Sequence, residues 1–267
     1  MNIIKSNLSP IIYVSGGAFG DFIQQLSIIN EFFLISGRKG ILYIINIPGD
    51  NFRHGIENVF NDTYDMVSSQ TYIKEYKIYN NEKFDINLSG WRNTPNMYTI
   101  NWYTIFKSYY GVEWGCHNWI NIPRHLINNK CLQNSVYKIE DIIFINDTSR
   151  RPIVNIDFNK LYLKHGKKLM FISGNQQDYI DFKKRTGLDI EMYNSTKFVD
   201  LCNALYHCKV LIGGLSSLLA IAHSMNVRRI VAIDVKHPDN DETMNLHLDK
   251  TMSNIFYPDD INIDNII

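Results

Sequence analysis

The segment from Ile11 to Asp21, IIYVSGGAFGD, constrains the fold of this chain more than any other. An apolar, β-rich run ends in a cluster of glycines, and apolar residues then recur at spacings of three and four from Phe22 to Ser36, which predicts an amphipathic helix. Gly37 stands where a helix C-terminus favours a residue with positive φ. A second β-rich run covers Gly40–Ile47. The segment therefore predicts a strand, a glycine loop, a helix and a strand, the repeating unit of an α/β fold.

The glycine loop is a candidate binding element. Gly17 and Gly20 let a backbone approach a ligand without a Cβ in the way, and the first turn of a helix favours negative charge. Asp21 has two interpretations: an N-cap of the helix, or a carboxylate at the mouth of a cleft beyond the carboxyl end of a parallel strand. The glycine spacing is neither Gly-x-Gly-x-x-Gly nor that of a P-loop.

Composition excludes several classes of partner. The 267 residues include 27 Lys+Arg and 27 Asp+Glu, so no overall field favours nucleic acid or an anionic membrane. No stretch approaches the roughly 20 apolar residues of a membrane span, and the N-terminus lacks the apolar core of a signal peptide. The four cysteines show no metal-binding spacing. We expect a cytoplasmic protein with reduced thiols and no metal.

Periodicity predicts further elements along the chain. The expected helices are His54–Val67, Asn101–Tyr110, Asp178–Thr186 and Phe198–Tyr206, and the expected strands are Tyr72–Tyr79, Phe84–Leu88, Asp141–Asn146, Lys168–Ile172, Lys209–Ile212 and Arg229–Ile233. A polar, irregular stretch at 128–136 predicts a domain boundary. We therefore expect an N-terminal domain at 1–130 and a C-terminal domain at 137–267.

Polar residues follow two of these strands. Trp91 and Arg92 come after Phe84–Leu88, and these residue types bind sugars and anions by stacking and bidentate hydrogen bonds; a packed tryptophan beside a solvated arginine is the alternative. Thr148, Arg150 and Arg151 follow Asp141–Asn146, and they suit a diphosphate as well as an ordinary exposed loop.

A second glycine turn lies at Gly213–Ser217. Gly214, Ser216 and Ser217 open a helix of small residues; one serine is a natural N-cap, and the other can offer its hydroxyl outward to a phosphate. Ser173 and Gly174, at the end of Lys168–Ile172, complete this candidate binding set. Two glycine-to-helix turns, one in each half, predict two Rossmann-like domains facing each other across a ligand cleft.

Both glycine turns resemble the heptosyltransferase-like glycosyltransferases of family 9. The resemblance rests on the N-terminal Gly-Gly-x-x-Gly-Asp and on the block VLIGGLSS before Leu218. It implies a GT-B fold, a nucleotide-sugar donor in the C-terminal half, an acceptor in the N-terminal half, no essential metal, and Asp21 as general base. The chain departs from the family's Asp-Ser-Gly-Pro-x-His motif: Leu215–Ala220 lacks both the Asp and the His, and His223, three positions later, is no substitute.

We therefore expect an inverting, metal-independent glycosyltransferase that uses a nucleotide-sugar and a glycan or other hydroxyl acceptor, without a cofactor or nucleic acid. Asp21 is the expected catalytic residue, and the expected acceptor side is Trp91 and Arg92. The expected donor side is Gly17, Gly20, Thr148, Arg150, Arg151, Ser173, Gly174, Gly214, Ser216 and Ser217.

Three alternatives stay open. The first is a GT-B-like nucleotide- or sugar-binding protein without transferase activity, which the missing motif residues favour. The second is a dinucleotide-dependent oxidoreductase, against which the glycine spacing argues, as does Asn46 where an acid is expected. The third is metal-dependent GT-A chemistry at Asp239-Asn240-Asp241, a triplet more typical of a solvated turn.

Overall fold

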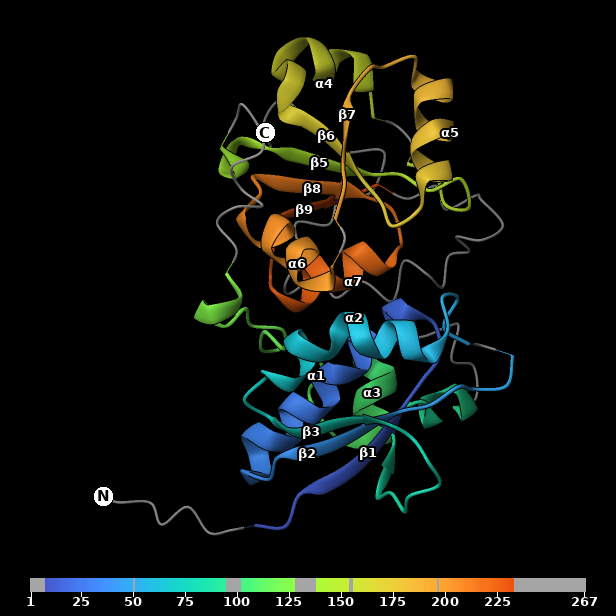
Figure 1. Cartoon of the computed structure of the whole chain (residues 1–267), viewed down its shortest axis with the longest axis vertical. Helices are drawn as coiled ribbons and strands as arrows, with labels where there is room; N and C mark the ends of the chain where they lie inside the picture. The colour runs from blue at the N-terminus through green and yellow to red at the C-terminus, as the bar shows by residue number, and fades with distance from the viewer. Residues whose placement is uncertain are drawn as a thin grey trace.

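The computed structural model describes residues 8–49, 51–94, 102–127, 138–153, 156–195 and 197–232. It contains two parallel sheets, of four and five strands. They lie at opposite ends of the molecule in Figure 1, with helices between them. The domain boundary expected at 128–136 and the triplet at 239–241 lie outside the described residues.

The first half forms the four-stranded sheet, in the order β3-β2-β1-β4 with every pair parallel. Its strands are β1 (Ile11–Ser15), β2 (Gly40–Ile44), β3 (Ile73–Ile78) and β4 (Ile86–Asn87). Its helices are α1 (Phe19–Ser36), α2 (Ile56–Ser68) and α3 (Trp102–Tyr110), with short 3₁₀ turns η1 (Gly90–Asn93) and η3 (Arg124–Leu126).

The second half forms the five-stranded sheet, in the order β7-β6-β5-β8-β9 and again parallel. Its strands are β5 (Ile143–Asn146), β6 (Leu169–Ile172), β7 (Glu191–Tyr193), β8 (Val210–Gly213) and β9 (Arg229–Val231). Its helices are α4 (Phe158–His165), α5 (Gln176–Thr186), α6 (Phe198–His207) and α7 (Ser217–Ser224), with 3₁₀ turns η4 (Ile139–Asp141) and η5 (Gly166–Lys168).

The expected α/β class with two Rossmann-like units is confirmed. Gly37 ends α1 with φ 69° as predicted, because the left-handed conformation lets its N–H reach the carbonyl of Phe33. Two elements were not expected from the sequence. The helix α4 has only eight residues, of which Phe158 and Leu161 are buried, and β7 is a three-residue edge strand without clear alternation.

The two halves share one hydrophobic core. Helices α1 and α2 of the first half face α6 and α7 of the second in Figure 1, and α1 packs against α7. One cluster of buried side chains contains Phe22 and Ile23 together with Ile221 and Ala222. A hydrophobic interface of this kind holds two lobes in a fixed relation.

A segment around Trp119 ties α1 to α7. The indole Nε1 of Trp119 donates to the carbonyl of Ile23, 2.8 Å away, and its backbone N–H donates to the carbonyl of Ser224 at 3.0 Å. Further along, the Asn30 amide donates to the carbonyl of Asn118. Asn118 also donates to the carbonyl of Met225, just past the end of α7, whereas Gly20 at the start of α1 lies near Ser217 at the start of α7, so the two helices run parallel. None of the helices in the described ranges has the length and apolar character needed to span a bilayer.

Candidate active site

Strand order places the candidate residues beside one another, in loops at the carboxyl ends of the strands of each sheet. In the first sheet β1 lies between β2 and β4, so the loops that leave β1 and β4 are neighbours. In the second sheet β5 lies between β6 and β8, which makes the loops after β5 and β8 neighbours in the same way. Open α/β sheets bind ligands at such reversals of strand order, outside the carboxyl ends of the strands.

The glycine loop after β1 needs its glycines for two different reasons. A Cβ on Gly16 would lie 2.3 Å from the backbone oxygen of Ile45, so no side chain fits there. Gly17 has φ 107°, a conformation that side chains disfavour. Ala18 is the N-cap and α1 starts at Phe19, so the N-cap interpretation of Asp21 is wrong. Asp21 lies in the first turn, because the glycine turn starts the helix three residues earlier than its apolar pattern indicated.

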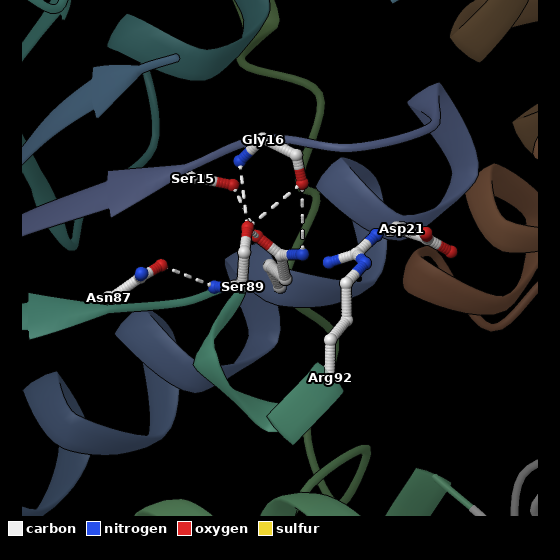
Figure 2. Close-up of polar contacts among 7 residues, drawn as sticks. Ser15, Gly16, Asp21, Asn87, Ser89 and Arg92 are labelled. Atoms are coloured by element: carbon white, nitrogen blue, oxygen red, sulfur yellow. Dashed lines mark hydrogen bonds and ion pairs between the residues drawn. The ribbon is translucent and has the colours of Figure 1, made fainter. Parts of the chain in front are cut away.

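Asp21 forms an ion pair with Arg92. The Arg92 Nη2 lies 2.5 Å from the Asp21 Oδ2, and the side chains are 18% and 27% exposed. The pair joins the start of α1 to η1, the turn after β4 (Figure 2).

Trp91 packs in the first half's core. Its side chain is 5% exposed, its ring contacts Phe106 edge-on, and the Arg92 guanidinium carbon lies 4.6 Å from its ring centroid. The packed-tryptophan interpretation therefore describes Trp91, whereas Arg92 is paired and mostly buried. The acceptor-binding role of both residues stays a prediction.

A buried polar network lies beneath the glycine loop, and it was not predicted (Figure 2). Ser15 Oγ donates to Gln25 Oε1 at 2.6 Å, and Gln25 Nε2 donates to the Gly16 carbonyl at 3.3 Å. Ser89 Oγ accepts from the Gly16 N–H at 3.1 Å and donates to the Gly16 carbonyl at 3.0 Å. A polar residue at position 25, on the otherwise apolar face of α1, was the available signal, since buried polar groups are nearly always hydrogen-bonded.

The serine turn after β8 is built on Asn146. Ser216 caps α7, accepting from the Leu219 N–H at 3.2 Å and donating to Asn146 Oδ1 at 2.6 Å. The Asn146 amide in turn donates to the Ile172 carbonyl at 2.8 Å, which ties the ends of β5, β6 and β8 together. Ser216 is thus the capping serine, and Ser217 is the first helical residue.

The loop after β5 packs on the same turn. Arg151 donates its N–H to Thr148 Oγ1 at 3.2 Å, and its guanidinium reaches the Leu215 carbonyl at 3.3 Å. A Cβ on Gly214 would lie 2.9 Å from the Arg151 oxygen, so Gly214 permits this approach. Arg150 is exposed on the same loop. Thr148, Arg151 and Gly214 are therefore brought together.

Two more residues of the predicted set follow β6. Ser173 Oγ donates to Asp178 Oδ2 at 3.0 Å and accepts from the Asn175 N–H, so it orders the start of α5. Gly174 has open space where a Cβ would point. The loops after β5 and β6 thus lie next to each other at the carboxyl ends of these neighbouring strands.

Sequence reasoning missed Asp147, which anchors the Thr148–Arg151 loop. Its buried carboxylate accepts from the Ile153 N–H at 2.7 Å and pairs with Arg185. Burial raises the pKa of Asp147, and the hydrogen bond and Arg185 oppose that rise. An acid directly after a buried strand was the signal for it.

The candidate residues of the two halves meet at Gly20. A Cβ on Gly20 would lie 3.5 Å from the Ser217 Cα, an ordinary van der Waals separation. The starts of two parallel helices therefore converge, and the backbone N–H groups of both first turns favour an anion. In Figure 2 the Asp21 carboxylate projects toward the brown ribbon of the second half.

Two cavities lie away from this site. One, of about 350 Å³, is lined by Asn118, Tyr206, Cys208, Met225, Asn226, Val227 and Arg228. The other, of about 310 Å³, lies beside α2 and α6. Neither is lined by a residue at the ends of β1, β4, β5 or β8. Within the described ranges, no group of three or more His, Cys, Asp and Glu residues is placed to hold a metal ion.

Comparison with known proteins identifies the fold. No family model and no curated protein matches this chain. Among solved structures, the glycosyl transferase family 9 protein from Veillonella parvula DSM 2008 has a TM-score of 0.60 at 11% identity, over 94% of this chain and 88% of its own. E. coli heptosyltransferase WaaC with ADP-2-deoxy-2-fluoro heptose gives 0.53 at 9% identity, over 84% and 88%. E. coli ADP-heptose lps heptosyltransferase II gives 0.51 at 9% identity, over 96% of each chain. The chain therefore has the α/β fold of these GT-B glycosyltransferases.

Proposed function

We propose that this protein transfers a sugar from a nucleotide-sugar to an acceptor hydroxyl, without a metal and with inversion, and that Asp21 is the general base. One observation carries the proposal: an added Cβ on Gly20 would lie 3.5 Å from the Ser217 Cα, so the first turn of α1, which carries Asp21, lies against the start of α7, and the Asp21 carboxylate projects toward the second half in Figure 2. The structural likeness to glycosyltransferases, one of them solved with an ADP-linked heptose analogue, supports the class of donor.

The donor's diphosphate fits the converging helix starts. Backbone N–H groups there, the Ser217 hydroxyl and the guanidinium of Arg151 supply hydrogen bonds and positive charge. Ser216 has a structural part in this arrangement, because its hydroxyl is already bonded to Asn146 and to the Leu219 N–H. Arg150, exposed on the same loop, adds a second positive charge.

The proposed reaction is a single displacement. The Asp21 carboxylate takes the proton of the acceptor hydroxyl as that oxygen attacks the anomeric carbon. The bond between this carbon and the diphosphate oxygen breaks, and the nucleoside diphosphate leaves with the electron pair. The helix starts stabilise the charge that develops on the leaving group. Arg92 holds the Asp21 carboxylate in position through their ion pair, on the side where we propose that the acceptor binds.

A protein that binds a nucleotide-sugar without transferring it is the second candidate. The segment Leu215–Ala220 favours it, because the Asp and His of the motif it resembles are absent. Both candidates require the nucleotide to bind at the start of α7, and they differ only in turnover.

Calorimetry with ADP-, UDP- and GDP-linked sugars, followed by a transfer assay, tests the proposal. A true donor at about 100 times its Kd adds roughly 2.7 kcal/mol of stability. We expect Ser217→Asp to abolish this binding by charge repulsion, and Asn159→Asp, on the exposed side of α4, to preserve it. Transfer to a glycan acceptor supports the enzyme, and binding with neither transfer nor hydrolysis supports the second candidate. Failure of every nucleotide and nucleotide-sugar to bind contradicts both.

A further inference from the structure

The hydrogen bonds of Ser15, Gln25 and Ser89 centre on the backbone of one residue, Gly16. The backbone N–H and C=O of Gly16 both bond to Ser89 Oγ, and the C=O also accepts from Gln25 Nε2. Gln25 Oε1 accepts a hydrogen bond from Ser15 Oγ at 2.6 Å and lies 3.4 Å from Ser89 Oγ. Ser15 and Gln25 are fully buried and Ser89 is 7% exposed. Their side-chain groups are thus committed to the loop and not to a ligand.

The network joins the two segments that carry the ion pair. Gly16 starts the loop that leads into α1 and to Asp21, and Ser89 immediately precedes η1, which carries Arg92. The Ser89 N–H also bonds to Asn87 Oδ1 at 2.9 Å, which fixes the serine to the end of β4 (Figure 2). A shift of Ser89 would therefore move the glycine loop and the arginine relative to each other.

We propose that Ser89, supported by Gln25, is a positioning residue that sets the Asp21 carboxylate against Arg92 for proton abstraction. This inference rests on the proposed transferase function. An apolar side chain in place of Ser89 would leave the N–H of Gly16 without this partner and would remove one donor from its C=O, so the network satisfies the backbone of the loop and fixes its position. The network can thereby orient Asp21 relative to Arg92. Such orientation matters for catalysis, since a misplacement of about 1 Å at a reacting group costs about 100-fold in rate.

Kinetics of Ser89→Ala test the proposal, with Ser224→Ala as the control. Ser224 is also buried, and its hydroxyl donates within α7 to the Ile221 carbonyl, away from the glycine loop. We expect Ser89→Ala to lower kcat by about 10- to 100-fold with the donor KM within about threefold, because ground-state binding is untouched. Ser224→Ala should keep the wild-type kcat. Gln25→Met keeps the approximate shape of the side chain and loses its hydrogen bonds to Ser15, Gly16 and Ser89. It should also lower kcat, and it is the second variant if Ser89→Ala does not fold.

A double-mutant cycle with Asp21→Asn separates positioning from general damage. If Ser89 acts through Asp21, adding Ser89→Ala to Asp21→Asn lowers kcat by less than about threefold, since the contribution of the base is already lost. If the fold-losses in kcat of the two single variants instead multiply in the double variant, the proposal is contradicted. A Ser89→Ala enzyme with wild-type kcat would contradict it as well, even if Asp21→Asn is inactive and the proposed function stands.

Amide hydrogen exchange gives a readout that needs no substrate. In Ser89→Ala, exchange of the Gly16 amide should accelerate by about tenfold or more, and exchange in α5 should not change. An unchanged exchange rate of the Gly16 amide would show that Ser89 does not hold the glycine loop in place. Faster exchange at Gly16 together with no turnover of any nucleotide-sugar by the wild type would instead refute the proposed function, and with it the catalytic part of this inference.

Discussion

Gly20 and Ser217 lie close together across the two halves of the protein: a Cβ added to Gly20 would be 3.5 Å from the Ser217 Cα. This proximity brings together the starts of α1 and α7, two parallel helices from different sheets. Two helix N-termini side by side concentrate positive potential. The account of a donor held there, with Asp21 beside it, depends on this relationship.

The glycine loop provides a matched pair of substitutions. Gly16→Ala should cost about 2–3 kcal/mol of unfolding free energy, because its Cβ would lie 2.3 Å from a backbone oxygen that cannot move cheaply. Gly20→Ala should be neutral or stabilise by up to about 1 kcal/mol, since the position is helical and has room for a methyl group. Urea denaturation of both variants measures the difference. Equal changes in unfolding free energy for the two variants would contradict the close backbone approach at Gly16 and the open space at Gly20.

Helix α6 is capped by a residue of the other half. The Asp62 carboxylate, on α2, accepts from the Phe198 N–H at 2.8 Å. Asp62→Ala should therefore cost about 1 kcal/mol, the usual loss for a helix cap. Asp65→Ala, at an exposed site of the same helix, is the control and should change the stability by less than about 0.5 kcal/mol. Matching losses in the two variants would show that the cap contributes nothing.

His223 should make the protein sensitive to acid. Its ring is buried against Trp114 and Trp119, and burial, with a smaller contribution from Arg229, lowers the pKa of His223 to about 3. The unfolded chain has the ordinary value of 6.5. Between pH 6.5 and 3 the unfolded state therefore binds a proton that the folded state does not, so stability falls as the pH falls.

Comparison with His223→Phe isolates this effect, because the acidic groups titrate in both proteins. From pH 6.5 to 4.5 the wild type should lose about 2–3 kcal/mol more than the variant, at about 1.4 kcal/mol per pH unit. Parallel stability curves would show that His223 is protonated at no cost in the folded protein.

Local patterns predicted much of the fold. The helices α1 and α7 and the strands β1, β2 and β8 follow from apolar periodicity and glycine turns, with shifts of a few residues at their ends. The helix α4 could have been found from Asp157, whose side chain accepts from the Lys160 N–H as an N-cap. The edge strand β7 could not, because three partly exposed residues carry no periodic signal.

The site was harder to predict than the fold. Asp21 and Arg92 were each predicted as site residues, but not as a pair. They are 71 residues apart in the sequence and meet because β1 lies next to β4. Local periodicity does not determine the order of strands in a sheet. The same holds for Gln25 and Ser89. The convergence of Gly20 with Ser217 depends on how the two halves pack, which no single segment specifies.

The catalytic assignment of Asp21 is tested most directly by the turnover of Asp21→Asn with a nucleotide-sugar that binds the wild type. The side chain keeps its shape and loses the charge that accepts the proton. Asp65→Asn, an exposed change of the same kind, is the control. The account predicts that Asp21→Asn lowers kcat by roughly 10²–10⁴-fold while calorimetry shows the donor bound with unchanged affinity. Turnover within a few fold of the wild type would contradict it.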